Sequence, residues 1–242
     1  MAEFRTRSGC ARCTTARCCL RFDPELTGYD LYRIMKGRAL AFDDVARWTP
    51  TRADQAEDDA IFLVDDIQAF EIRLRRTHQD GTAVGNGGPR RCGLLVSVDE
   101  GVNRCGVYAH RPMRCRTFPT EDTPYGVVVR TPESICPPGA WIVSRVDLGA
   151  RRKVHTRAAF ERALHRRVLG RWNQAQIVER PIGAAQSAYV RAALAFYAAI
   201  EADIETWLNA ESNAAAGDVV FEDAVATALT SVFGPLCDML RT

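Results

Sequence analysis

The chain has 242 residues, of which 47% are hydrophobic and 26% are charged, and its formal net charge is +2. These values are ordinary for a globular protein, and they exclude a disordered chain, a collagen-like chain and a coiled-coil rod. The net charge is too small to indicate a polyanionic partner, so nucleic acid is not an expected ligand. Nine cysteines are the unusual feature of the composition.

The cysteine content indicates metal binding when it is combined with the expected location of the chain. No stretch reaches the ~18 consecutive apolar residues that a membrane span requires. The N-terminus lacks the apolar core of a secretory signal. We therefore expect a cytoplasmic protein without membrane association. Thiols stay reduced in the cytosol, so many cysteines there favour metal ligation or redox chemistry over a disulfide framework.

The first cysteine group has the pattern C-x2-C-x4-C-C and consists of Cys10, Cys13, Cys18 and Cys19. A two-residue spacer lets two thiolates turn back on one ion, and it recurs in zinc and iron–sulfur sites. In an extended backbone, neighbouring side chains point to opposite sides. Cys18 and Cys19 are therefore expected to serve two metal centres or two metals of one cluster. The alternative is that one or two of these cysteines are simply buried apolar residues.

The segment after this group is predicted to contain two helices and a strand. Thr27 is a suitable N-cap for a helix over 28–36, and Gly37 is the expected stop signal. Residues 41–48 are predicted to form a second helix. Apolar side chains alternate with charged ones over 70–74, and this alternation predicts a half-buried strand.

The second cysteine group begins in a predicted hairpin. Residues 92–98 are apolar and β-branched, turn-forming residues follow, and 105–108 can return as a second strand. This hairpin would bring Cys92 and Cys105 close together.

Two further cysteines are predicted to lie in loops. Pro112 disfavours a helical conformation at the residue before it, so 109–116, which carries Cys115, is predicted to be a loop that wraps back towards the hairpin. Cys136 precedes two prolines in another predicted loop. The ninth cysteine, Cys237, lies in an apolar C-terminal run and is expected to be a packing residue.

Arginines are frequent around Cys115. A site with four thiolates carries net negative charge, and nearby guanidinium groups would offset it and lower the pKa of the thiols. The alternative is that arginine is simply common in this chain, in which lysine occurs only twice. His110, in the same segment, is interpreted as a spectator. The arginines in question are Arg104, Arg111, Arg114 and Arg116.

After residue 150 the sequence becomes helical in character. Helical periodicity predicts helices over 156–179, 186–209 and 220–233. The stretch from Arg151 to Arg171, which overlaps the first of them, contains eight basic residues and one acidic residue. We interpret this stretch as a solvated helix face, and binding of phosphate or an acidic partner is the alternative.

The cysteine patterns resemble those of the CxxCxxCC cysteine-cluster family, the YkgJ-type family described as zinc- or iron-chelating. Flagellin lysine N-methylase belongs to it. The resemblance covers about residues 8–140, and its most specific part is Tyr108-x2-Arg111-Pro112-x2-Cys115-Arg116. It implies metal or cluster binding by the matched cysteines, with Tyr108 and the arginines Arg111, Arg114 and Arg116 around the ligands. The four-residue spacer between Cys13 and Cys18 is wider than the family pattern.

Together these patterns predict an α+β protein. A cysteine-rich module over residues 1–145 is expected to have a few antiparallel strands and loop-borne metal ligands, and a helical region over 146–242 is expected to pack on it. The predicted ligands are Cys10, Cys13, Cys18, Cys19, Cys92, Cys105, Cys115 and Cys136.

Three functions are compatible with these ligands. The first is binding of one or two iron–sulfur clusters, of the 4Fe-4S type, for redox or Lewis-acid chemistry. The second is an interaction module stapled by Zn²⁺, because both centres accept four thiolates tetrahedrally. The third is an S-adenosylmethionine-dependent protein lysine N-methylase, which rests on family analogy alone. The sequence leaves open whether the chain is an enzyme and which protein or small molecule is its partner.

Overall fold

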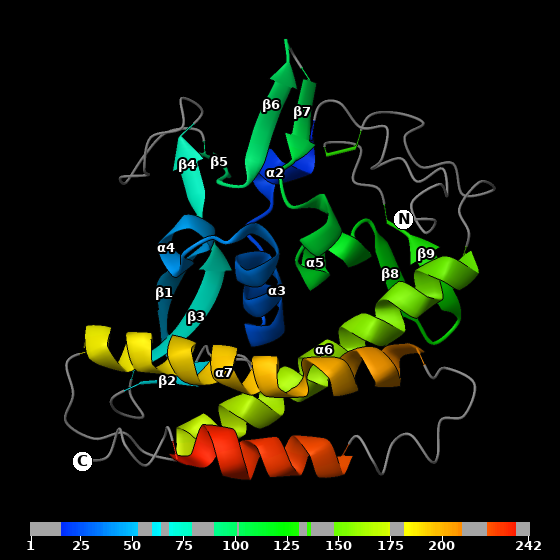
Figure 1. The fold of residues 1–242 in the computed structure, drawn as a ribbon. Helices are drawn as coiled ribbons and strands as arrows, with labels where there is room; N and C mark the ends of the chain where they lie inside the picture. The colour runs from blue at the N-terminus through cyan, green and yellow to red at the C-terminus, as the bar shows by residue number, and fades with distance from the viewer. Residues whose placement is uncertain are drawn as a thin grey trace. The chain divides into compact units, whose positions relative to one another are not determined.

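The computed structural model describes residues 16–52, 60–63, 68–78, 90–100, 102–130, 135–136, 148–174, 182–209 and 222–235. Within these residues the fold is mixed α+β with a helical C-terminal region, and the predicted fold class is confirmed (Figure 1). The chain divides into two compact units that interleave along the sequence. The predicted division between residues 145 and 146 stays a prediction.

Unit 1 comprises the described residues of Met1–Leu26, Ile34–Arg47 and Arg73–Phe160. It is built from short elements, mainly two-stranded antiparallel pairs and single helical turns. Its helices are α2 (Arg17–Arg21), α4 (Phe42–Val45), η3 (Tyr108–His110) and α5 (Met113–Thr117). Its strand pairs are β4 (Arg76–His78) with β5 (Arg90–Cys92), β6 (Leu95–Asp99) with β7 (Val102–Cys105), and β8 (Thr120–Thr123) with β9 (Gly126–Val129).

Unit 2 comprises the described residues of Thr27–Arg33, Trp48–Ile72 and Glu161–Thr242. It contains most of a three-stranded sheet of order β1-β3-β2, formed by β1 (Ala46–Arg52), β3 (Gln68–Leu74) and β2 (Ile61–Phe62). It also contains α7 (Ile182–Asn209) and a helix over 222–228 that continues as the π-helical turn η5 (Leu229–Phe233). Helices α3 (Gly28–Arg38) and α6 (Leu148–Gln174) each contribute residues to both units.

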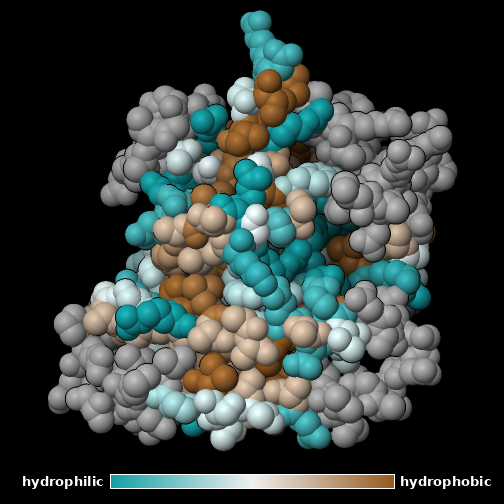
Figure 2. Space-filling model, viewed as in Figure 1, coloured by the Kyte–Doolittle hydropathy of each residue, from teal (hydrophilic) through white to brown (hydrophobic). Residues whose placement is uncertain are grey.

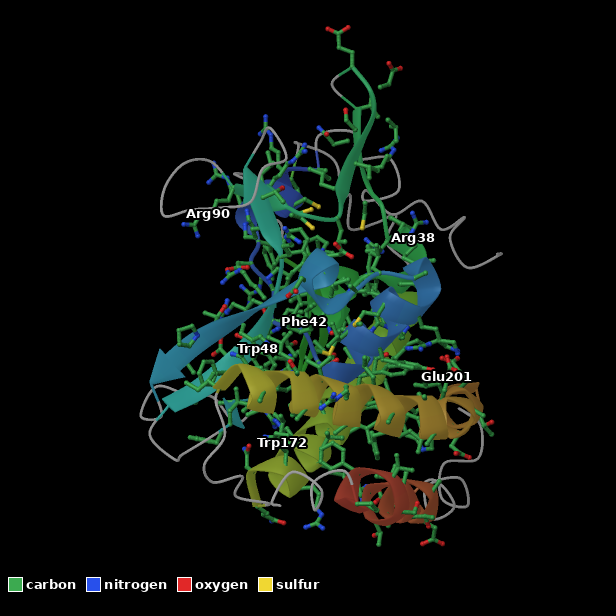
Figure 3. All side chains as sticks on the ribbon, turned by 60° about the vertical axis from the view of Figure 1, so that its left-hand side comes forward. Arg38, Phe42, Trp48, Arg90, Trp172 and Glu201 are labelled. Carbon is green, nitrogen blue, oxygen red and sulfur yellow. The ribbon has the colours of Figure 1, made fainter. Side chains whose placement is uncertain are left out.

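Aromatic side chains form the core of unit 2. The ring centroid of Trp172 on α6, which is labelled in Figure 3, lies 5.1 Å from that of Tyr189 on α7, in an edge-to-face arrangement. Phe233 packs against Trp172 and Phe196 at 6.2 Å each. The Trp172 indole donates a hydrogen bond of 3.0 Å to the Phe62 carbonyl and so ties the helix to β2. Rings in these offset geometries add about 0.5–1.5 kcal/mol per pair to the burial of their surface.

Helix α3 confirms the predicted helix and its N-cap but not its stop signal. The Thr27 hydroxyl accepts a hydrogen bond of 3.1 Å from the Asp30 amide, and the Asp30 carboxylate accepts one of 3.2 Å from the Thr27 amide. This reciprocal pair is a capping box. The helix continues past Gly37 to Arg38, and Ala39 follows it in the left-handed region with φ 51°. Gly37 serves packing instead, because a Cβ there would lie 2.4 Å from the His110 ring.

The other predicted elements are confirmed to different extents. The strand over 70–74 lies within β3, where Phe70, Ile72 and Leu74 are buried as predicted. The helix predicted over 41–48 is wrong in its second half, because α4 ends at Val45 and β1 begins at the next residue.

The long C-terminal helices were predicted correctly, and both begin earlier than the periodicity indicates. Helix α6 starts at residue 148 and is described to 174, so the rest of the predicted 156–179 lies outside the described residues. Helix α7 starts at 182 and includes all of 186–209. Among the helices that the structure describes, none has the length and apolar character needed to cross a membrane.

The hairpin of β6 and β7 exposes apolar side chains. Val96 and Val98 are 43% and 59% exposed, and Figure 2 shows hydrophobic residues on the surface of this hairpin. Val96 lies opposite Arg104 in the antiparallel register, so apolar and charged side chains share this surface. At the base of the hairpin, the buried Leu95 lies opposite the half-buried Cys105.

Candidate metal centre

Helix α2 carries two adjacent cysteines. The backbone enters it through Ala16, whose φ of 45° is left-handed, and the Cys19 amide donates to the Ala16 carbonyl at 2.8 Å. The thiol of Cys18 donates a hydrogen bond to the sulfur of Cys19. The expectation that the two side chains diverge from an extended backbone is therefore wrong, because this segment is helical. The argument for two separate centres was drawn from an extended backbone and no longer applies, so the number of centres stays a prediction.

Cys92 and Cys105 each end a strand. Cys92 is the last residue of β5 and lies opposite Arg76, whereas Cys105 is the last residue of β7 and lies opposite Leu95. The predicted strand over 92–98 is divided in the structure, because a turn at 93–94 separates β5 from β6. The two cysteines therefore belong to two neighbouring hairpins.

A glycine follows each of these two cysteines and allows a tight turn. The Gly93 amide donates to the Arg75 carbonyl, and the Gly106 amide donates to the Leu94 carbonyl, both at 2.8 Å. A Cβ at Gly93 would lie 3.1 Å from the Arg75 oxygen, and one at Gly106 would lie 3.0 Å from the Leu94 oxygen. A side chain at either position would push the glycine away from the carbonyl that its amide binds, and this would displace the end of the strand that carries the preceding cysteine. A Cys-Gly pair occurs at both positions, a sequence signal that the prediction of one strand over 92–98 did not use.

Cys115 lies on α5, so the loop predicted over 109–116 is wrong in detail. Pro112 keeps Arg111 extended, with φ −51° and ψ 140°, as its ring requires. The helix then begins directly after the proline, because the missing N–H of a proline is not needed at a helix start. The short turn η3 precedes it and includes Tyr108.

Five sulfurs from four elements interact with one another. The thiol of Cys19 donates a hydrogen bond to Cys92, and an electrostatic interaction with Cys105 also raises its pKa. Electrostatic interactions with Cys19, Cys105 and Cys18 raise the pKa of Cys115. Helix α2, strands β5 and β7, and helix α5 therefore direct their cysteines into one region of unit 1.

The surroundings of four of these thiols, those of Cys18, Cys19, Cys105 and Cys115, keep them protonated in the absence of metal. The hydrogen bond that Cys19 accepts from Cys18 lowers its pKa, but its bond to Cys92 and its burial outweigh this and raise the pKa to about 12. The hydrogen bond to Cys19, together with burial, raises the pKa of Cys18. Burial raises the pKa of Cys105 and Cys115. A metal ion that binds here must displace protons, and it would relieve the mutual repulsion of the thiolates.

Arg111 is a cation that acts on this cluster. Its charge lowers the pKa of Cys18, Cys105 and Cys115. The guanidinium carbon lies 4.1 Å from the centroid of the Tyr108 ring, a cation–π distance that fixes its position. Its Nε is buried and has no hydrogen-bond partner among the described atoms.

The remaining arginines of the predicted set have other contacts in the structure. Arg114 lies 3.7 Å from Glu25 and forms an ion pair with it. The backbone carbonyl of Arg116 accepts a hydrogen bond of 2.9 Å from Arg151, which also contacts Thr120. Arg151 was interpreted as part of a solvated helix face, and that interpretation is wrong for this residue.

The cysteine-rich part of the chain matches a known protein family. Residues 9–137, more than half of the chain, match the model of the CxxCxxCC family, described as a "putative zinc- or iron-chelating domain". The chain belongs to the CxxCxxCC family. The predicted family is thus confirmed, and with it the coarse function of chelating zinc or iron. No curated protein and no solved structure matched the chain.

The CxxCxxCC match includes all eight predicted ligands, but the structure describes only part of them. Cys10 and Cys13 lie outside the described residues, as does Cys237. Cys136 is buried, at 9% exposed, and only Ile135 is described beside it. Within the described ranges, no group of three or more His, Cys, Asp or Glu side chains is already arranged to hold a metal ion.

The donor chemistry of the CxxCxxCC cluster nevertheless fits a thiophilic metal. All five interacting donors are sulfur, which selects zinc or iron–sulfur centres over hard cations such as Ca²⁺. The Val107 amide donates a hydrogen bond to the Cys105 sulfur and lowers the pKa of that thiol, as amides do around metal-bound thiolates. Arg111 supplies positive charge beside the sulfurs. The residues that would hold the metal are Cys18, Cys19, Cys92, Cys105 and Cys115 together with the predicted Cys10, Cys13 and Cys136.

Proposed function

We propose that this CxxCxxCC domain holds an iron–sulfur centre of the 4Fe-4S type through cysteine thiolates. The observation that supports the proposal is the interaction of five cysteine sulfurs in one region of unit 1. A single zinc ion in a closed structural site takes four ligands. A 4Fe-4S cluster is likewise held by four cysteines, so five described thiols, with three more predicted ligands in the chain, favour more than one centre.

The protein groups around the sulfurs would tune such a centre. When bound, an iron–sulfur cluster supplies electron transfer, or Lewis-acid chemistry at an iron that lacks a protein ligand. Arg111 offsets the negative charge of the thiolates and favours the more reduced state of the site. The amide of Val107 withdraws charge from the Cys105 sulfur in the same sense. Cys92 is buried and the other four cysteines are half-buried, which limits the access of water to the sulfurs.

A zinc staple is the second candidate, and the architecture of unit 1 favours it specifically. The four elements that carry the thiols are a five-residue helix, two strands of three and four residues, and another five-residue helix. Two-stranded pairs and single helical turns are marginally stable by themselves. A structural zinc ion would hold them together and would make the module an interaction surface rather than a redox site.

One analysis separates the two candidates. The full chain is purified anaerobically, and iron, acid-labile sulfide and zinc are measured together with the visible absorption spectrum. A brown protein with stoichiometric iron and sulfide supports the iron–sulfur proposal. A colourless protein that contains only zinc overturns it in favour of the staple. A protein that retains neither metal, and that binds neither on reconstitution, overturns both.

Two serine variants provide a matched control for that analysis. Cys115→Ser removes a thiol of the described cluster, whereas Cys237→Ser removes a cysteine outside the predicted ligand set. The first is expected to lower the bound metal and the second to leave it unchanged. A cytoplasmic location and a protein or small-molecule partner are part of the same proposal. The S-adenosylmethionine-dependent alternative stays a prediction, tested by calorimetry with that methyl donor.

A further inference from the structure

We infer that Arg76 and Arg151 are positioning residues for the proposed metal site, on which this inference rests. Each guanidinium binds the backbone carbonyls at the C-terminal end of one ligand-bearing helix. Arg76 binds the end of α2, which carries Cys18 and Cys19, and Arg151 binds the end of α5, which carries Cys115.

Both helices need such a partner because they are very short. Each has five residues, and the last four carbonyl groups of any helix lack an intrahelical donor. A helix of this length is far below the ~12–15 residues at which isolated helices become marginally stable in water. The position of a thiol on such a helix therefore depends on what holds its ends.

Arg76 connects α2 to the strand that carries Cys92. Its side chain, 8% exposed, donates one hydrogen bond of 2.7 Å to the Leu20 carbonyl and another to the Phe22 carbonyl at the end of α2. It donates a third, of 2.7 Å, to the carbonyl of Arg90 on β5. Arg76 also lies opposite Cys92 in the strand register. One guanidinium thus sets the spacing between the Cys18–Cys19 turn and Cys92.

Arg151 holds α5 in the same way from the beginning of α6. Its guanidinium donates to the Arg116 carbonyl at 2.9 Å and to the Thr117 carbonyl at the end of α5. Its Nε donates to the Thr120 hydroxyl at 3.0 Å, and that hydroxyl donates in turn to the Thr117 carbonyl at 2.7 Å.

The guanidinium geometry is necessary for this role. Arginine presents five N–H donors in a rigid fork, whereas a lysine ammonium is a compact charge on a flexible stem. Arg76 binds three carbonyl oxygens, and Arg151 binds two carbonyls and one hydroxyl. A lysine in either place would keep the charge but would not hold all of these acceptors at once.

Double-mutant cycles test the inference in the full, metal-free chain, with Co²⁺ as the probe because its thiolate absorption reports both affinity and sulfur ligation. The Arg151 cycle contains Arg151→Met, Cys115→Ser and the double variant. The Arg76 cycle contains Arg76→Met, Cys19→Ser and their combination. Arg151→Lys and Arg76→Lys are tested in parallel. Arg152→Met is the matched control, because this exposed arginine is the next residue on α6.

Each methionine variant is expected to weaken Co²⁺ binding about 10-fold or more and to reduce the thiolate absorption, as is usual when the support of a metal ligand is lost. The lysine variants should lie between methionine and wild type. In the matching serine background, the arginine substitution should cause no further loss, because it acts through that cysteine. If a methionine variant does not fold, its lysine counterpart is compared with wild type in the same cycle.

Three outcomes are distinguishable. Wild-type affinity in the arginine variants, or additive losses in the double variants, overturns the positioning role and leaves the metal site standing. Equal losses in Arg152→Met also overturn it, because the effect would then be one of net charge. A wild-type chain that shows no thiolate absorption with Co²⁺ contradicts the metal site itself.

Discussion

Replacement of Arg111 by glutamine should weaken metal binding without removing a ligand. The Arg111 charge acts on three of the five interacting thiols, and the stacking of its guanidinium on Tyr108 holds it in place. A divalent ion with four thiolates has a net charge of about −2, so the loaded site attracts this cation more strongly than the neutral thiols do. Loss of the charge therefore penalises the metal-bound form.

The size of the effect follows from Coulomb's law with solvent screening. Two unit charges ~6 Å apart interact by about 3 kcal/mol at an effective dielectric of 20, so a charge of about −2 gives roughly 6 kcal/mol before desolvation. Arg111 is only partly buried, and partly exposed pairs retain a fraction of that energy. We expect a net loss of about 2 kcal/mol, which corresponds to roughly 30-fold weaker binding.

The assay is anaerobic competition for Zn²⁺ between the protein and a chromophoric chelator. Arg111→Lys keeps the charge and should lose much less affinity than Arg111→Gln. Arg130→Gln is the charge-matched control, because Arg130 is exposed in the same unit and pairs with Glu121 at 2.8 Å. The reasoning is refuted if Arg111→Gln binds zinc within twofold of Arg130→Gln. It is also refuted if the lysine variant is as weak as the glutamine variant.

Three stability predictions complement this one, each measured by urea unfolding followed by circular dichroism. Gly106→Ala should destabilise the chain by about 1–3 kcal/mol, because the new Cβ would lie 3.0 Å from the Leu94 oxygen, and no loss would contradict the tight turn. Gly170→Ala, with open space around its Cβ on α6, should stabilise by about 0.5–1 kcal/mol and serves as the control. Thr27→Ala should cost about 1 kcal/mol through loss of the capping box, and an unchanged midpoint would disprove that role. In the presence of a chelator, the metal-free chain should lose stability as the pH rises from about 9 towards 12. The reason is that thiols of the unfolded chain ionise in this range, whereas Cys19 in the folded chain has a raised pKa and stays protonated. The loss of unfolding free energy is at most about 1.4 kcal/mol per pH unit for this thiol, and it should be smaller in Cys19→Ser.

The long helices and strand β3 could be predicted from the sequence for a physical reason. Helices α3, α6 and α7 extend over three or more turns, so their apolar residues repeat often enough to define a buried face. The N-cap at Thr27 is equally local, because the hydrogen bonds of a capping box join residues three apart. Strand β3 follows from the alternation of apolar and charged side chains over residues 70–74.

The short helices could not be predicted from the sequence in the same way. Helices α2 and α5 have five residues each, too few for a periodic pattern, and their ends are held by arginines far away in sequence. Gly37 was interpreted as a stop signal, but its absent side chain makes room for the His110 ring instead. Such roles depend on contacts between distant residues, which local propensity does not encode.

By itself, the amino-acid sequence determined which residues can act as donors and which family the chain belongs to, because thiol chemistry and the spacing of cysteines are properties of the covalent chain. Only the tertiary structure decided which sulfurs meet. The hydrogen bond from Cys18 to Cys19 exists because the turn around them is helical, and the approach of Cys92, Cys105 and Cys115 depends on two hairpins and on α5. These approaches result from long-range hydrogen bonds and burial, which exist only once the chain has folded.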